Sequence, residues 1–204
     1  MREANALRQP VIIEPEIHKV TPEMLQNAEA RETLKAPEFR FAASDGRTYQ
    51  LSEERADGPV VLIFIKDGCP CSVSAETHFN DLHAAYEGHV RFFGVFDGSL
   101  EKARGWASRN AVPFPILLDP EGNLVRLYQA RNSAYVVLID RSGTIDAFWP
   151  GYSSAMLQVV NARIAKLAGL PEAAINTSEA PDELYSGCPF EIETEAPPVK
   201  TSSP

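Results

Sequence analysis

The sequence predicts an α/β fold in which helices flank both faces of a mixed central β-sheet. Val60–Ile65 is a continuous apolar run rich in β-branched residues, which is typical of a strand buried on both faces. Pro70–Tyr86 follows it as a helix whose apolar residues recur at helical spacing, namely Ala75, Phe79, Leu82 and Tyr86. Strands and helices then alternate, and a hairpin joins the last two strands, so parallel and antiparallel pairing are both expected.

The remaining elements of this middle region are shorter. Strands are expected at residues 90–96, 116–118 and 135–139, with a helix at 101–110 and a turn at 119–122. Residues 140–143 have hairpin-turn chemistry and lead into a strand at 144–149. An amphipathic helix at 153–167 closes the unit and is stopped by Gly169 and Pro171.

The two ends of the chain differ in composition from its middle. Residues 1–35 form a polar N-terminal arm with one helix, which Thr21 can cap and Pro22 can begin. Residues 36–170 form the folded domain. Residues 171–204 are rich in proline and acidic residues, so we expect a largely solvated tail with a short docked piece around residues 184–190.

Charge and hydropathy exclude several classes of partner. The formal net charge of −9 leaves no basic face for nucleic acid, and an anionic membrane surface would repel it. No apolar run approaches the ~18–20 residues that cross a bilayer. Residues 1–20 lack the apolar centre of a secretory signal. We therefore expect a cytoplasmic protein, in a compartment where thiols stay reduced.

Three cysteines, Cys69, Cys71 and Cys188, are the strongest clue to function. Cys69 lies where the first buried strand meets a helix, and Pro70 suits the first helical position, so Cys69 caps the helix. Unpaired N–H groups and the helix dipole lower a thiol pKa there from its free value of ~8.5. Cys71 lies in the first turn, where a disulfide to Cys69 would close a small, strained ring.

Four stretches of the chain carry a family resemblance. They are Ala-Pro-Glu-Phe at 36–39, the strand at 60–65 running into Cys69 and Pro70, Phe-Pro-Ile-Leu-Leu-Asp-Pro-Glu-Gly-Asn at 114–123, and Val-Leu-Ile-Asp-Arg-Ser-Gly at 137–143. Residues 36–168 resemble the redoxin branch of the thioredoxin fold, which contains the alkyl hydroperoxide reductase and thiol-specific antioxidant family. The resemblance implies a thioredoxin-like fold and gives Cys69 the place of the cysteine that attacks a peroxide or a disulfide.

The chain departs from both patterns of this fold at the site. Peroxiredoxins usually have Thr three residues before the reactive Cys and Pro four residues before that Thr, where this chain has Lys66 and Leu62. They also place an Arg against the sulfur, for which Arg131 is the nearest basic residue in sequence. Thioredoxins place a cis-Pro there, where the candidates here are Ser133 and Ala134. The sequence thus matches the fold of both groups and the complete site of neither.

The sequence is interpreted as that of an enzyme, a thiol-dependent oxidoreductase of the peroxiredoxin-like type with antioxidant activity. Catalysis is assigned to Cys69, with Cys71 favoured as the faster resolving partner because it is near, and Cys188 as a second acceptor between Gly187 and Pro189. The expected substrate is a peroxide or a disulfide, and the expected reductant is of thioredoxin or glutathione type. No cofactor is expected, neither nucleic acid nor membrane is a partner, and homodimerisation is left open.

Two alternatives remain at this stage. The first is a thioredoxin-like disulfide reductase without peroxidase activity. The second, from a different class, is a soft-metal protein that binds copper or zinc through Cys69 and Cys71. Two further side chains are of interest near the site: Lys66 either stabilises the thiolate or marks the exposed end of a strand, and Glu76 is expected to face solvent.

Overall fold

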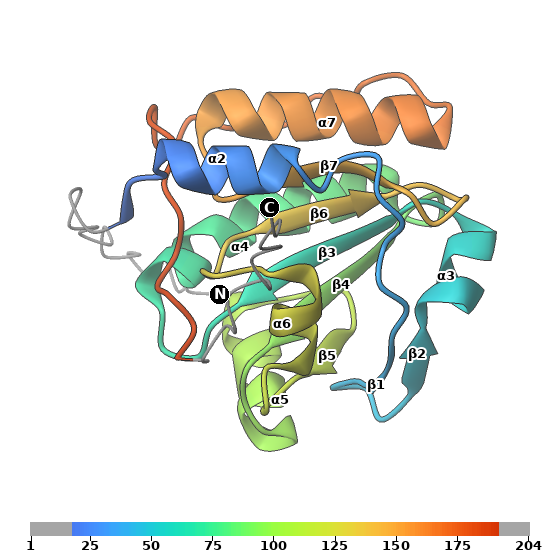
Figure 1. Cartoon of the computed structure of the whole chain (residues 1–204), viewed down its shortest axis with the longest axis vertical. Coiled ribbons are helices and arrows are strands. Elements are labelled where there is room, and N and C mark those ends of the chain that lie inside the picture. The colour runs from blue at the N-terminus through green and yellow to red at the C-terminus, as the bar shows by residue number, and fades with distance from the viewer. Residues whose placement is uncertain (1–17, 192–204) are drawn as a thin grey trace, which may run out of the picture.

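A computed structural model describes residues 18–191 of the chain. Its centre is a five-stranded sheet with the order β5-β4-β3-β6-β7 (Figure 1). The strands are β3 (Val60–Ile65), β4 (Arg91–Phe96), β5 (Ile116–Leu118), β6 (Val136–Ile139) and β7 (Ile145–Trp149). β3, β4 and β5 pair in parallel, whereas β6 runs antiparallel to both β3 and β7. The predicted mixed sheet is therefore confirmed.

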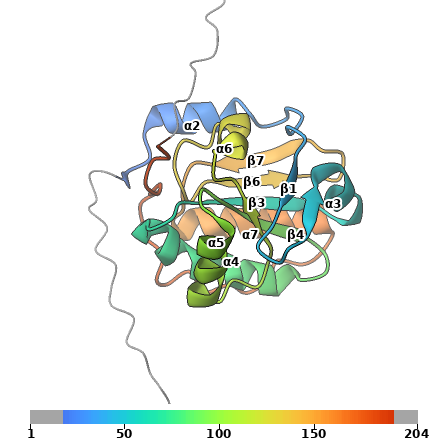
Figure 2. The same cartoon turned by 90° about the horizontal axis from the view of Figure 1, so that it is seen from below.

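β3 is central because every one of its residues is apolar and buried. Alternate side chains enter two separate core clusters, Val61, Ile63 and Ile65 on one face and Val60, Leu62 and Phe64 on the other. Three helices cover the first face: α4 (Pro70–Tyr86), α5 (Leu100–Asn110) and α7 (Ser154–Ala168) (Figure 2). The second face is covered by α2 (Pro22–Glu29), α3 (Leu51–Asp57) and α6 (Asn123–Tyr128).

Helix α4 carries the candidate site at its N-terminus and has the predicted bounds. Pro70 is its first residue and Cys69 its N-cap. The four apolar residues at helical spacing are each 1% exposed and pack on the sheet: Ala75, Phe79, Leu82 and Tyr86. Burial of this stripe fixes the rotation of α4 and therefore the direction in which its first turn faces.

Several short elements are not evident from the sequence pattern. These are the hairpin of β1 (Arg40–Ala42) and β2 (Thr48–Gln50), and the helices α3 and α6. The predicted turn at 119–122 exists, with the Gly122 N–H donating to the Asp119 carbonyl at 2.9 Å. Helix α6 begins directly after it, and Asp119 accepts a hydrogen bond from the Val125 N–H at 3.0 Å. The two helices have fewer than two full turns, which is too short for a helical period to show, and the two hairpin strands carry no continuous apolar run.

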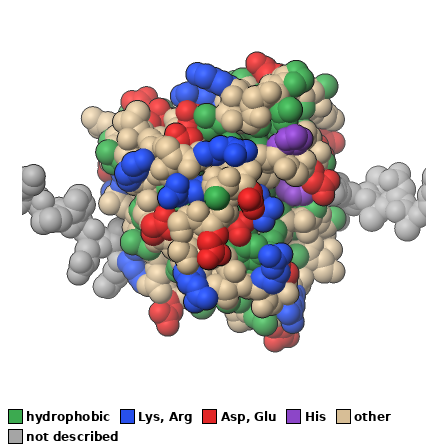
Figure 3. Space-filling model, turned by 90° about the vertical axis from the view of Figure 1, so that its right-hand side faces the viewer, with side chains coloured by type: hydrophobic (Ala, Val, Ile, Leu, Met, Phe, Trp, Pro, Cys, Tyr) green, Lys and Arg blue, Asp and Glu red, His purple; other side chains and the backbone are tan. Residues whose placement is uncertain are grey.

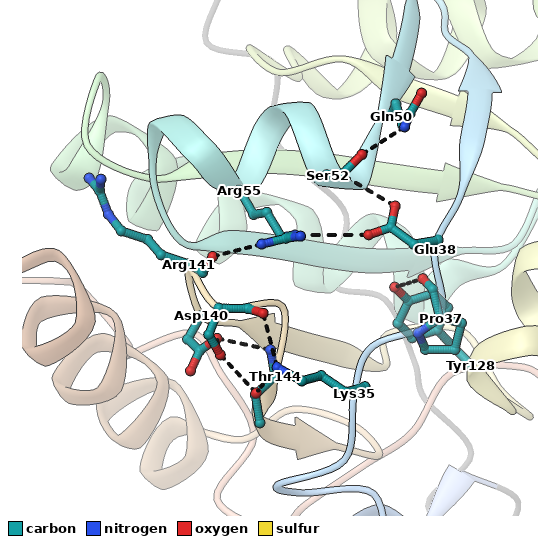
Figure 4. A network of polar contacts seen from close by, with 11 residues as sticks. Lys35, Pro37, Glu38, Gln50, Ser52, Arg55, Tyr128, Asp140, Arg141 and Thr144 are labelled. Atoms are coloured by element: carbon teal, nitrogen blue, oxygen red, sulfur yellow. Dashed lines mark hydrogen bonds and ion pairs between the residues drawn. The ribbon is translucent and has the colours of Figure 1, made fainter.

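The segment that enters the domain is held by polar contacts to three separate elements (Figure 4). The Tyr128 hydroxyl of α6 donates to the Pro37 carbonyl at 2.8 Å. Glu38 accepts from the Ser52 N–H of α3 at 3.2 Å and pairs with Arg55 at 3.8 Å. Lys35 reaches the β6–β7 turn, where its Nζ donates to the Thr144 hydroxyl at 3.2 Å. The end of the N-terminal arm is thus fixed to the domain.

The C-terminal segment is docked over a longer stretch than the short piece expected. Partly buried apolar side chains pack against the cluster under α4 and α7, namely Ala173, Ile175, Ala180 and Leu184. The Ser154 N–H donates to the Pro181 carbonyl at 2.8 Å, and Tyr152 and Tyr185 exchange two main-chain hydrogen bonds. In Figure 1 this segment passes the edge of the molecule where α4 begins.

Surface charge is mixed on the face shown in Figure 3, where basic and acidic side chains alternate without a large area of one sign. Among the helices of residues 18–191, none is long and apolar enough to cross a membrane.

Glu76 corrects one expectation. This side chain was expected to face solvent, but it is 1% exposed on the inner side of α4, and neither carboxylate oxygen has a hydrogen bond of normal geometry. Burial raises the pKa of Glu76 to about 8, and the Trp106 indole N–H only partly opposes this rise. The carboxyl is therefore neutral in the folded chain at pH 7, which makes its burial tolerable.

We propose that residues 171–191 belong to the folded unit. A chain ending at Ala168 would lose the four partly buried apolar side chains of the segment, together with Leu170 and the buried Phe190, and it would expose the α4–α7 cluster. We expect a loss of about 3 kcal/mol in unfolding free energy, or roughly 5–10 °C in melting temperature. Thermal unfolding measured beside a chain that ends after residue 191 tests this. Equal melting temperatures for the two chains would show that the segment adds nothing.

Glu76→Gln should change how stability depends on pH. An unfolded Glu titrates near ~4.3, whereas the folded Glu76 keeps its proton to about pH 8. Between these values the folded state binds more protons, so the wild-type unfolding free energy falls as pH rises. The unfolding free energy of Glu76→Gln relative to that of the wild type should therefore increase on the order of 3 kcal/mol between pH 5 and pH 8. Denaturant unfolding at both pH values measures this difference, with the exposed Glu101→Gln as the control. An equal pH dependence of the unfolding free energy in Glu76→Gln and the wild type would contradict the prediction.

Candidate active site

Cys69 lies at the junction predicted for it, after β3 and before α4. Gly68 has a φ of +73°, a left-handed conformation that glycine adopts without strain, and the Cys69 N–H then donates to the Lys66 carbonyl at 3.2 Å. This tight turn places Cys69 at the helix N-cap with only 2% of its surface exposed. Its side chain makes no capping hydrogen bond to the helix. The sulfur therefore obtains its partners from elsewhere in the chain.

The first partner is Ser133, which is fully buried just before β6. Its hydroxyl donates to the Cys69 sulfur at 3.2 Å. Two main-chain hydrogen bonds hold this segment against the end of β3, because the Ala134 N–H donates to the Phe64 carbonyl at 2.7 Å and the Phe64 N–H to the Tyr135 carbonyl at 3.0 Å. The β3–β6 pairing thus brings Ser133 beside Cys69.

The second partner is Cys188, 119 residues further along the chain, whose main-chain N–H donates to the Cys69 sulfur at 3.2 Å. Residues 187–190 lie antiparallel to residues 131–133. The Ser133 N–H donates to the Cys188 carbonyl at 3.0 Å, and the Gly187 N–H donates to the Ser133 carbonyl at 2.8 Å. The C-terminal segment therefore covers Cys69 and completes its surroundings.

The three thiols are free, and their pKa values move in opposite directions. The pKa of Cys69 is lowered, first by a hydrogen bond from the Cys71 thiol, against the opposing effect of burial, and then by donors from Cys188 and Ser133. The pKa of Cys71 is raised by its hydrogen bond to Cys69 and by burial. Burial and the neighbouring Cys69 also raise the pKa of Cys188, and the charge of Lys66 partly opposes this rise. The contacts thus favour the thiolate form of Cys69 and the protonated forms of Cys71 and Cys188.

The sequence pattern of the AhpC/TSA family matches residues 33–148, which is more than half of the chain. The chain belongs to the AhpC/TSA family. A curated relative, peroxiredoxin Bcp of Bacillus subtilis (strain 168), is 27% identical over 95 residues, which are 46% of this chain and 60% of the relative. The chain thus spans 60% of the length of that peroxiredoxin.

Solved structures show the same fold. A hypothetical protein from Sinorhizobium meliloti 1021 has a TM-score of 0.63 and 18% identity, over 80% of this chain and 96% of that one. Peroxidoxin BcpB from Mycobacterium tuberculosis has a TM-score of 0.57 and 19% identity, over 69% and 98% of the two chains. At such identities the likeness supports the fold alone, and it confirms the predicted thioredoxin-like architecture.

Other residues that the sequence analysis considered lie in different places. Lys66 lies at the site but binds the C-terminal segment, with its Nζ 2.8 Å from the Pro189 carbonyl and 3.4 Å from Glu191. Arg131 forms an ion pair with Glu23 of α2 at 3.1 Å. Among residues 18–191 no group of three or more His, Cys, Asp or Glu side chains is placed to hold a metal ion.

Ser133 is the site residue whose role the sequence analysis missed. In sequence it stands near the position of the thioredoxin cis-proline, a pattern that gives no indication of a hydroxyl donor. The available signal was the place of a serine directly before a buried strand that must pair with the strand carrying Cys69. A hydroxyl at that position can donate a hydrogen bond directly to the Cys69 sulfur.

Cys69 should react as a thiolate well below neutrality, since its pKa is lowered. We expect the rate of its alkylation by iodoacetamide to stay nearly constant from pH 6 to pH 8. The rates of Cys71 and Cys188 should be far lower and should rise about tenfold per pH unit, because this range lies below their raised pKa values. Peptide-resolved mass spectrometry of the reduced chain measures all three together. A tenfold rise per pH unit for Cys69 over this range would contradict a stabilised thiolate.

Proposed function

We propose that the chain is a thiol-dependent peroxidase in which Cys69 attacks the peroxide and Cys188 resolves the oxidised form. The observation that carries this proposal is the Cys69 sulfur, which accepts hydrogen bonds from the Ser133 hydroxyl and the Cys188 N–H while the Cys188 thiol lies beside it. A buried thiolate held by donors is a reactive nucleophile. Family membership and the relative named peroxiredoxin Bcp support a peroxide substrate.

The first step oxidises Cys69. Its thiolate attacks one oxygen of a hydroperoxide, the O–O bond breaks, and Cys69 becomes a sulfenic acid. The other oxygen leaves with the electron pair of the O–O bond and takes up a proton to form an alcohol, or water from hydrogen peroxide. Because Cys69 is only 2% exposed beneath the C-terminal segment, a small oxidant reaches it with less rearrangement than a protein disulfide needs.

Cys188 is the better placed thiol for the second step. From sequence, Cys71 was favoured because a distant tail would have to move, but residues 187–190 are already docked on Cys69. A Cys69–Cys71 bond would distort the first turn of α4 around Pro70. In the proposed step the Cys188 sulfur attacks the sulfenic sulfur, forming the disulfide and releasing water.

An external thiol then completes the cycle. Cys188 is half-buried, whereas Cys69 and Cys71 are buried. A thioredoxin- or glutathione-type thiolate therefore reaches the Cys188 sulfur first. Its attack releases Cys69 as a thiolate, and a second thiol frees Cys188 while the reductant becomes the disulfide. We propose that this occurs in the cytoplasm, where such reductants are kept reduced.

A disulfide reductase is the second candidate. Lys66 and Leu62 stand where peroxiredoxins usually have Thr and Pro, so the usual peroxide-binding side chains are replaced. The main chain at 131–133 also binds an extended segment, as it would bind a peptide substrate. The two candidates separate in one assay panel, because a peroxidase consumes peroxide with a dithiol, whereas a reductase reduces insulin without peroxide turnover.

The central test uses three variants and one equivalent of hydrogen peroxide. Cys69→Ser should abolish peroxide consumption, and Cys188→Ser should leave a sulfenic acid on Cys69 that a dimedone probe captures. Cys71→Ser should still form the disulfide. After thiol blocking, peptide mapping of the wild type should show a Cys69–Cys188 link at the earliest times. A dominant Cys69–Cys71 link would reverse the assigned order, and peroxide turnover by Cys69→Ser would remove the nucleophile from the proposal.

A further inference from the structure

Almost every main-chain polar group of the segment at 187–189 has a partner in the domain. Ser133 accepts from the Gly187 N–H at 2.8 Å and donates to the Cys188 carbonyl at 3.0 Å. The Asn132 side chain donates to the Gly187 carbonyl at 2.8 Å, and Lys66 to the Pro189 carbonyl at 2.8 Å. The Cys188 N–H is different, because it donates to the Cys69 sulfur. These contacts position one main-chain N–H on the reactive atom.

Ser133 lies at the centre of this arrangement. Its hydroxyl donates to the Cys69 sulfur directly, while its own N–H and carbonyl hold the two residues that carry the second donor. The residue has no exposed surface, so no water competes for these groups. One residue therefore provides the first donor to the sulfur and fixes the place of the second.

Gly187 makes this close approach feasible. A Cβ at this position would lie 1.9 Å from the Ser133 hydroxyl oxygen and 2.8 Å from the Ser133 carbonyl carbon and oxygen. Real Cβ atoms do not come so near, and the main-chain atoms of a buried residue beside β6 cannot yield. Any side chain at this position must therefore move the segment away from Ser133, and the Cys188 N–H moves with it.

We propose that Ser133 is a positioning residue for Cys69, and that with Gly187 it makes the main-chain N–H of Cys188 a working part of the active site. The inference rests on the proposed function, since it explains how the nucleophile is kept as a thiolate. It gives Cys188 two separate tasks. The N–H stabilises the anion of Cys69 before the reaction, and the thiol resolves the oxidised sulfur after it.

The physical reason is the cost of burying a charge. A thiolate that is 2% exposed loses most of its hydration, and hydrogen-bond donors must replace the water. Ser133 and Cys188, which follow Cys69 by 64 and 119 residues, supply two of these donors. Undocking of the C-terminal segment would remove the N–H of Cys188, so the reactivity of Cys69 depends on the docked segment even when the Cys188 thiol takes no part.

The experiment compares alkylation midpoints of Cys69 in the full chain, measured from iodoacetamide rates between pH 3 and pH 10. Ser133→Ala should raise the midpoint by about one unit, and Gly187→Val by more, because it displaces the N–H and the thiol of Cys188 together. Cys188→Ser keeps both the N–H and a hydroxyl donor, so its midpoint should stay near that of the wild type. Ser178→Ala, an exposed position in the same segment, is the matched control.

Each result decides one claim. Unchanged midpoints in both Ser133→Ala and Gly187→Val would overturn the inference. A rise in Cys188→Ser as large as that in Gly187→Val would also overturn it, since the thiol alone would then account for the effect. If Gly187→Val fails to fold, as far-ultraviolet circular dichroism would show, Gly187→Ala replaces it, because a Cβ alone already clashes with Ser133. A wild type with the low midpoint but without peroxide turnover would refute the proposed function while the midpoints still test the inference.

Discussion

The antiparallel pairing of β3 with β6 is the constraint on which the candidate site depends. It joins the end of the strand that leads to Cys69 with the beginning of the strand that follows Ser133. The turn through Gly68 and the helix that starts at Pro70 fix the sulfur from one side. The residues before β6 then offer their main chain to the C-terminal segment. Strand pairing thus brings Cys188 to Cys69 and Cys71, which are already neighbours in sequence.

The pKa of Cys69 is lowered by short contacts from neighbouring side chains and one main-chain N–H. The Cys69 side chain makes no capping bond to α4, so the helix N-terminus is not its main source of donors. Two neighbouring thiols, one hydroxyl and one main-chain N–H contribute instead. These groups stabilise the anion of Cys69. The same hydrogen bonds to Cys69, together with its charge, raise the pKa values of Cys71 and Cys188. One cluster of hydrogen-bonded thiols thereby gives the nucleophile a lower pKa than the two thiols beside it.

Much of this protein could be predicted from its sequence, because β3 and α4 combine strong hydrophobic patterns with clear boundaries. Val60–Ile65 and Pro70–Tyr86 were predicted with the observed bounds, and the fold followed from their order. The short helices α3 and α6 carry too few turns to show a period. Glu76 was misplaced because burial of a lone carboxyl is rare and depends on the neutral form. The contact between Ser133 and Cys188 could not be predicted, because it joins two segments that are distant in sequence and meet only in the folded structure.

The late position of Cys188 in the sequence has a consequence for a chain that is still being synthesised. Every strand of the sheet precedes residue 150, so the domain core can form while the C-terminal segment is still being synthesised. During that interval Cys69 is present on a folded sheet without the Cys188 N–H and without its resolving thiol. A nascent chain, or one clipped by a protease after α7, would expose a cysteine that reacts less readily and, once oxidised, has no covering segment to protect it. Cys69 therefore acquires the Cys188 N–H and the resolving thiol only after residues 187–190 have been synthesised and docked.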